Sequence, residues 1–141
     1  MTAAFSFRVR GEPKAKGSLR PVPLSDGRTV LLSAKNTQDW ERLVRFQAQQ
    51  WEGPPLAECA LEMTMTFYLP RPASAPKRYI LPWKKPDGDK LLRAVLDALT
   101  GIVYRDDAQV TDIHVRKRFS AAFVGLDVSV RVLEDDDVHR V

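Results

Sequence analysis

Strict alternation of apolar and polar residues in three segments is the strongest constraint on how this chain folds. It runs through residues 5–10, 61–69 and 124–132, and a less regular form occupies residues 111–119. Successive side chains of a β-strand point to opposite faces of a sheet, so a period of two predicts strands that bury one face. Because the short stretch that begins with residues 120–122 joins the last two predicted strands, we expect these strands to pair as a hairpin.

Two further segments have the period of an amphipathic helix. In the first, a capping sequence at residues 36–39 precedes apolar side chains at helical spacing from Trp40 to Trp51. In the second, an apolar stripe runs through residues 89–100 and stops at Gly101. The order β-α-β-α-β-β predicts an α+β fold, with a mixed sheet of about four strands and two main helices packed on it. A length of 141 residues suits a single compact domain.

The net charge of +4 is unevenly distributed along the chain. The last eight residues contain four acids and one base, so residues 1–133 contain 21 bases and 14 acids and have a net charge of +7. We therefore expect a basic domain at residues 1–133 and an acidic, disordered tail at residues 134–141. The tail either only aids solubility or covers the basic surface until a partner displaces it. A basic domain favours an anionic partner, and nucleic acid is the commonest one.

No segment of the sequence predicts export or a membrane span. Residues 1–10 lack a signal-peptide pattern, and no apolar run approaches the ~18 residues of a transmembrane helix. The one cysteine, Cys59, has no partner for a disulfide within the chain. We expect a cytoplasmic protein without a membrane partner.

Two proline-rich stretches concentrate the basic residues. Residues 11–26 contain three prolines, and residues 70–86 contain five prolines and no acid. We expect both stretches to be loops that bind the phosphates of nucleic acid. With one residue of the following helix, the predicted DNA-binding residues are Lys14, Lys16, Arg20, Arg71, Lys77, Arg78, Lys84, Lys85 and Lys90.

Two pairs of aspartates flank the second predicted helix. Asp87 and Asp89 lie at its start, and Asp106 and Asp107 follow it. The helix rises roughly 15 Å, and an extended chain from residue 102 to residue 107 returns up to ~20 Å. We therefore expect Asp107 to lie beside Asp87 and Asp89.

Three carboxylates in one place indicate a cation. They would repel one another and raise one another's pKa values unless a positive ion lay between them. A set of oxygen ligands without His or Cys favours Mg²⁺, or Mn²⁺ in its place, over zinc. With basic residues around it, such a site suits hydrolysis of phosphodiesters, because the metal activates water and the bases offset the charge that develops on phosphate.

Each of these motifs also has an ordinary structural interpretation. Asp87 or Asp89 suits the N-cap of a helix, and Asp106 with Asp107 suits a turn before a strand. Arg93 follows Asp89 by four residues, which is the spacing of an ion pair within a helix. The metal-site hypothesis therefore depends on the motifs occurring together.

Three aromatic residues flank the acidic motifs in the sequence. Tyr79, Trp83 and Tyr104 could stack on nucleobases, and packing in the core is an equal alternative for each.

The run from Pro86 to Val110 resembles the RusA family of Holliday junction resolvases. That family begins its helix with Asp-x-Asp-Asn-Leu-x-Lys, continues with Asp-Ala-Leu, and places Asp-Asp-x-Gln before a strand. This chain has Asp87-Gly-Asp, Asp97-Ala-Leu and Asp106-Asp-Ala-Gln in the same order and at matching spacing. A weaker similarity covers the basic loop at residues 11–20.

The resemblance implies a homodimeric, Mg²⁺-dependent endonuclease that nicks four-way DNA junctions symmetrically, in recombination and repair, in a bacterium or its phage. By position, Asp87, Asp89 and Asp107 would be the catalytic, metal-binding carboxylates. Arg93 stands where the family has a catalytic lysine, and Lys90 stands where it has asparagine. Arginine keeps the positive charge but does not give up a proton, so charge stabilisation by Arg93 is retained and acid catalysis by it is not.

The sequence thus predicts a junction-resolving endodeoxyribonuclease with no small-molecule cofactor. Two alternatives stay open. One is a DNA-binding module without catalysis, in which the aspartates only form caps and turns. The other is a less selective Mg²⁺-dependent nuclease that acts on flaps or replication forks.

Overall fold

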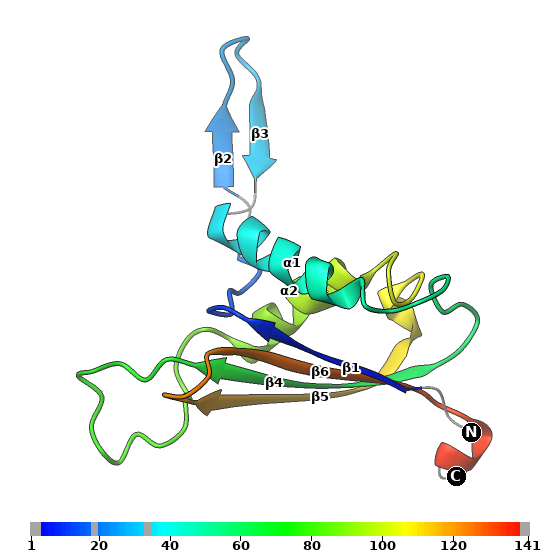
Figure 1. Cartoon of the computed structure of the whole chain (residues 1–141). Coiled ribbons are helices and arrows are strands. Elements are labelled where there is room, and N and C mark those ends of the chain that lie inside the picture. Colours follow the sequence, from blue (N-terminus) through cyan, green and yellow to red (C-terminus); the bar gives the residue numbers. More distant parts are fainter. Residues whose placement is uncertain (1–3, 18–19, 33–34, 139–141) are drawn as a thin grey trace.

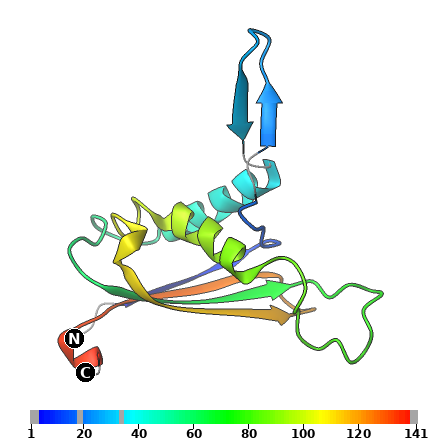
Figure 2. The ribbon, with the colours of Figure 1, turned by 180° about the vertical axis from the view of Figure 1, so that it is seen from behind.

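The computed structural model describes residues 4–17, 20–32 and 35–138 of the chain. Its main sheet has four strands, and both helices cover the same face of that sheet (Figures 1 and 2). The strands, in spatial order, are β1 (Ala4–Arg10), β6 (Gly125–Val132), β4 (Leu61–Leu69) and β5 (Val110–Phe119). The helices are α1 (Lys35–Ala48) and α2 (Gly88–Leu99). The predicted α+β fold and the predicted element order within the main sheet are confirmed.

The predicted hairpin between the last two strands is wrong. β4 lies between β5 and β6, pairing in parallel with β5 and antiparallel with β6. The short connection at residues 120–124 therefore crosses the end of β4 instead of turning back on β5. Alternate side chains of β4 are fully buried, and a strand in that position needs a neighbour on each side to satisfy its backbone.

A hairpin that the sequence pattern did not predict interrupts the first basic stretch. β2 (Arg20–Pro23) pairs antiparallel with β3 (Thr29–Leu32), and the pair extends away from the sheet as an arm (Figure 1). Gly27, with φ of 87°, provides the turn. The prolines in β2 concealed the strand, but a two-stranded ribbon tolerates proline because each strand has a free edge.

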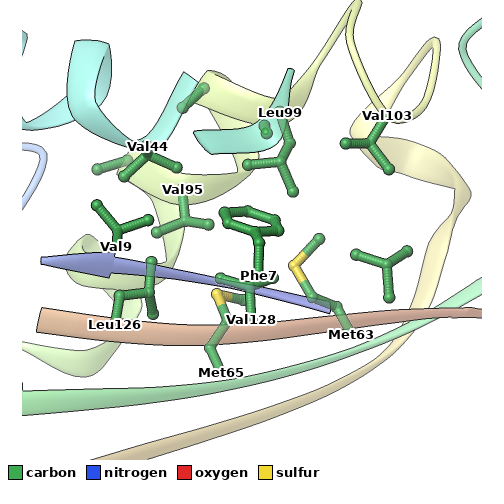
Figure 3. Packing of buried hydrophobic residues seen from close by; sticks show 14 of the residues in the cluster. Phe7, Val9, Val44, Met63, Met65, Val95, Leu99, Val103, Leu126 and Val128 are labelled. Atoms are coloured by element: carbon green, nitrogen blue, oxygen red, sulfur yellow. The ribbon is translucent and has the colours of Figure 1, made fainter. Parts of the chain in front are cut away.

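The core lies between the two helices and the sheet. The apolar positions of β1, β4 and β6 point toward α1 and α2, which present Val44, Val95 and Leu99 to them (Figure 3). In α1 the buried hydrophobic residues Trp40, Val44 and Ala48 are spaced four apart, so the helix buries one narrow stripe. The alternation in the sequence therefore located the buried face of the sheet correctly.

The described part of the acidic tail is folded. Asp135–Asp137 form a short 3-10 turn, and the Asp137 carboxylate accepts hydrogen bonds from the Glu134 backbone at 2.7 Å and from Arg131 at 2.9 Å. These two bonds lower the pKa of Asp137. The turn lies at the end of the sheet opposite the loop that joins β4 to α2 (Figure 1), so in this structure it does not cover that loop. Residues 139–141 lie outside the described part of the chain, so the expected disorder of the tail stays a prediction.

No helix among the described residues has both the length and the apolar content needed to cross a membrane.

Gly125 provides a test of how β1 and β6 pack. A Cβ atom at this position would collide with the carbonyl oxygen of Val9 and with the ring of Phe123, whereas one at Gly17 would meet nothing within 4 Å. We expect Gly125→Ala to lower the free energy of unfolding by about 1–3 kcal/mol, the usual cost of overpacking. The control Gly17→Ala should leave it unchanged or slightly higher. Urea unfolding monitored by circular dichroism measures both, and equal stabilities for the two variants would contradict the packing described.

Candidate active site

Both basic loops and the start of α2 lie at the same edge of the main sheet. β1, β4 and β5 run in the same direction, so their carboxyl ends share one edge, and the loops at residues 11–17 and 70–87 leave from it. Lys117 of β5 fixes the start of α2 at this edge, because its ammonium donates to the carbonyl oxygens of Lys84 and Pro86, each at 2.8 Å. The sheet therefore brings together segments that are about 60 residues apart in sequence.

The two loops enclose a hollow of about 420 Å³, here called the basic hollow. Its charged residues are three bases, Lys14, Arg71 and Lys85, and one acid, Glu12. Its other lining residues are Pro13, Ala15, Leu69, Pro70, Pro72, Tyr79, Pro82, Pro86 and Phe119. A concave surface with excess positive charge attracts phosphate groups, which agrees with the predicted role of these loops.

Asp87 has the backbone position of an N-cap but does not act as one. Its backbone is extended, with φ of −71° and ψ of 138°, yet its carboxylate makes no capping hydrogen bond to α2. The nearest cations are the ammonium groups of Lys90 at 3.4 Å and Lys85 at 3.8 Å. The simple capping interpretation of Asp87 therefore does not account for its side chain.

Asp89 and Arg93 lie on the first two turns of α2, and both side chains are exposed. They form no ion pair with each other, although the structure describes both. Asp89 lines a second pocket, which it shares with Lys117. The structure thus places two carboxylates at the start of one helix, followed by a guanidinium that has no ion pair with any residue in the described part of the chain.

Asp106 and Asp107 differ in what their side chains do: that of Asp106 forms a structural hydrogen bond, and that of Asp107 does not. Asp106 caps the 3-10 turn η1 (Asp107–Gln109) by accepting from the Ala108 backbone at 2.9 Å. Gln109 completes the turn, since its Oε1 accepts from the backbone N–H groups of Arg105 and Asp106. The side chain of Asp107 takes no part in these bonds, so the turn explains one of the two acids only.

Asp107 does not lie beside Asp87 and Asp89, contrary to the expectation from chain length. β5 begins just after Asp107 and rises about 23 Å before Lys117 reaches the start of α2, so roughly 20 Å separate the two acidic motifs. Among the described residues, no group of three or more His, Cys, Asp or Glu side chains could hold a metal ion. Because β5 pairs in parallel with β4, α2 must return the chain to the opposite edge before β5 can start.

Tyr104 holds the chain at that opposite edge. Its side chain is fully buried, and its hydroxyl donates to the carbonyl oxygen of Leu96 at 2.8 Å. Burial raises the pKa of Tyr104 above its usual range. Tyr104 is thus a core residue, and the suggestion that it stacks on nucleobases is wrong.

Lys16 has a structural role within the chain, and its predicted role in DNA binding stays a prediction. Its ammonium lies 2.9 Å from Glu41 and 3.2 Å from Asp97, and its side chain is only 21% exposed. Burial acts to lower the pKa of Lys16, but the hydrogen bonds to these two carboxylates outweigh it, so the pKa is raised. This residue fastens the first loop to both helices.

The remaining predicted bases differ in what they contact. Arg71 donates to the carbonyl oxygens of Pro76 and Tyr79 and so braces its own loop, while Lys84 lies 5.2 Å from the ring centre of Trp83. The side chain of Arg20 lies outside what the structure describes. The exposed residues of the set are Arg71, Lys77, Arg78, Lys84 and Lys85.

The sequence analysis missed four basic residues at this edge. Lys117 supports the loop before α2, and Arg10, Arg116 and Arg118 lie toward the same end of the uncovered face of the sheet. Bases at alternate positions of a strand resemble an ordinary solvated face. Only the parallel pairing of β4 with β5 places them next to the loops.

The chemistry of the carboxylate pair fits a hard divalent cation. Mg²⁺ binds through one or two protein carboxylates together with water and substrate phosphates. Asp87 and Asp89 provide such a pair next to the basic hollow, whereas the full set of three carboxylates does not assemble within one chain. A cation held by the two carboxylates of one chain would take its remaining ligands from water and phosphate oxygens.

An α+β domain that gathers a carboxylate pair and basic loops at one sheet edge has the features of a nucleic-acid-processing protein. A sequence profile described as endodeoxyribonuclease RusA matches residues 11–131 of the chain. A protein of Bacillus subtilis (strain 168) named "Uncharacterized protein YqaN" is 30% identical over 126 residues, which cover 82% of this chain and 88% of that protein. This chain belongs to the RusA family of endodeoxyribonucleases.

The two lysines of the first loop should respond differently to substitution. Lys16→Met leaves the half-buried Glu41 without its cation, so we expect the free energy of unfolding to fall by about 1–2 kcal/mol. Lys14→Met should change the free energy of unfolding by less than about 0.5 kcal/mol. It should remove about one phosphate contact, so the logarithm of the DNA-binding constant should fall less steeply with the logarithm of the salt concentration. Urea unfolding and binding titrations at several salt concentrations test this contrast. Wild-type stability in Lys16→Met would contradict the structural role.

Proposed function

We propose that this protein is a Mg²⁺-dependent endodeoxyribonuclease that resolves four-way DNA junctions by paired nicks, with Mn²⁺ able to replace Mg²⁺. The observation that carries the proposal is the start of α2, where Asp87 lacks a capping bond and lies with Asp89 beside the basic hollow. Membership of the RusA family supports the endonuclease activity. The proposed setting is recombination and repair in the cytoplasm of a bacterium.

Asp87 and Asp89 would hold the metal, which when bound activates water and stabilises the charge on the phosphate. The protein's own residues would position the DNA. Lys14, Arg71 and Lys85 bind backbone phosphates in the basic hollow. Arg93, which is unpaired and exposed one turn after Asp89, stabilises the negative charge that develops on the cleaved phosphate. Arginine cannot serve as the acid that protonates the leaving oxygen, so that proton comes from another donor.

The protein would act as a homodimer. A four-way junction has near two-fold symmetry, and its resolution needs two matched cuts, which a two-fold dimer delivers. Within one chain Asp107 lies about 20 Å from Asp87. The proposed role of Asp107 as a metal ligand is therefore assigned to the site of the second protomer.

A DNA-binding module without catalysis is the second candidate function. The separation of Asp107 from the carboxylate pair favours it, because the described residues of one chain then bring two acidic ligands together and not three. Incubating the protein with branched DNA and Mg²⁺ and looking for nicks distinguishes the two functions. A less selective nuclease would instead nick flaps and forks as fast as four-way junctions.

Asp89→Asn tests the metal-binding assignment. We expect it to abolish Mg²⁺-dependent nicking of a four-way junction while junction binding stays the same or improves, since a negative charge near phosphate is removed. Asp39→Asn is a matched control, because Asp39 is an exposed helical aspartate paired with Arg42 at 3.3 Å on α1. Cleavage assays on four-way, flap and linear duplex substrates at one salt concentration measure rate and selectivity. Full cleavage by Asp89→Asn would sink the assignment.

Mixing two inactive variants tests whether the sites are shared between protomers. A dimer of one Asp89→Asn chain and one Asp107→Asn chain has one intact site if Asp107 serves the partner, and none if each chain completes its own site. We expect the mixture to nick one strand of the junction, while each variant alone nicks neither. Denaturing gels of a junction labelled on each strand record the nicks. An inactive mixture, with dimers shown by sedimentation, would contradict the shared site.

A further inference from the structure

A pocket of about 410 Å³ opens beside Asp89 and is not explained by phosphate or metal binding. We call it the Trp83 pocket. Its walls are mostly apolar, and its two charged members are Asp89 and Lys117. The other lining residues are Leu81, Pro82, Trp83, Gly88 and Leu92, with Val115 from β5. A volume of this size falls within the range of roughly 300–1,000 Å³ that is common for small-ligand sites.

Trp83 forms an aromatic wall of this pocket and contributes little to the core. Its side chain is 75% exposed, the largest value among the exposed large hydrophobic residues that the structure describes. Its ring contacts Tyr79 edge-on at 5.7 Å, and Tyr79 in turn contacts Phe119 at 5.1 Å. Lys84 lies 5.2 Å from the Trp83 ring centre. The indole therefore contacts Tyr79 and Lys84 and keeps three quarters of its surface exposed.

The ligand that fits this combination is flat and uncharged. The apolar walls disfavour a phosphate group, because burying its charge against them is costly. A nucleobase has two apolar faces that stack on an indole, and a polar edge that can hydrogen-bond. Asp89 can accept such a bond, and Lys117 has one donor left after its two bonds to Lys84 and Pro86.

We propose that the Trp83 pocket binds one unpaired nucleobase of a branched DNA, with Trp83 stacked on it, and so selects branched over linear DNA. The inference rests on the proposed function, because it needs a DNA strand at Asp89. Extracting a base from an intact duplex breaks its pairing and its stacking on both sides, whereas a base at an open branch point has a stacking neighbour on one side and costs less free energy to extract. The pocket thus selects branched DNA at the place where Asp87 and Asp89 lie.

Substitutions at one loop separate stacking from general binding. Trp83→Ala should weaken junction binding by roughly fivefold to a hundredfold, the usual range for losing one stacked base, and Trp83→Phe should restore most of it. Ile80→Ala is the matched control, because Ile80 is 73% exposed on the same loop and does not line the pocket. All three variants should bind linear duplex DNA as the wild type does.

Junctions with an abasic position test the contact directly. One nucleotide at a time near the crossover is replaced by an abasic residue, and binding is measured for wild type and Trp83→Ala. At one position the abasic junction should bind the wild type more weakly, and Trp83→Ala should there cause no further loss, which shows coupling between indole and base. If Trp83→Ala weakens binding by the same factor for the intact junction and for every abasic junction, the proposal is overturned. A wild type that binds junctions but never nicks them would overturn the proposed nuclease while leaving this test intact.

Discussion

Parallel pairing of β4 with β5 is the constraint on which the arrangement of the site depends. Two neighbouring parallel strands need a connection that returns the chain from one edge of the sheet to the other, and here the loop at residues 70–87 and α2 provide it. The loop and the start of α2 must then lie at the edge where β4 ends, and Asp107 must lie at the edge where β5 begins. β1 ends at the first of these edges as well, so its loop joins the same surface. The basic loops lie around Asp87 and Asp89 because of the directions of β1, β4 and β5, and no additional side-chain packing is needed to bring them together.

The fold could be predicted from the sequence where local periodicity decides it. The alternation in β1, β4 and β6 reports one buried face, and this is a property of each strand by itself. Pairing partners are not local, and short connections favour hairpins, so the position of β4 between β5 and β6 was missed. The arm formed by β2 and β3 was missed for a different reason. Proline predicts loops in general, but it is tolerated at the free edge of a two-stranded ribbon.

The candidate site was predictable in its residue types and not in its geometry. The spacing of Asp87 and Asp89 identified the start of α2, and the capping-box spacing from Asp106 to Gln109 is the sequence signal that marks Asp106 as the capping acid. Lys14 and Lys16 look alike in the sequence, and only the partners supplied by α1 and α2 make Lys16 an internal ion pair. The general lesson is that residue type limits the chemistry, while contacts over long sequence separations decide which residue is free to perform it.

The ion pairs around Asp87 explain how its carboxylate stays available to a ligand although several bases surround it. Lys85 and Lys90 lie 3.8 Å and 3.4 Å from it, and the three side chains are 83%, 43% and 40% exposed for Lys85, Lys90 and Asp87. Ion pairs this exposed contribute little to stability, so exchanging them costs the fold almost nothing. Lys16 shows the opposite case, since its pairs with Glu41 and Asp97 are more buried and join three elements. The exposed charges of Asp87, Lys85 and Lys90 therefore contribute little to the fold and are free to exchange their partners for phosphate and a cation.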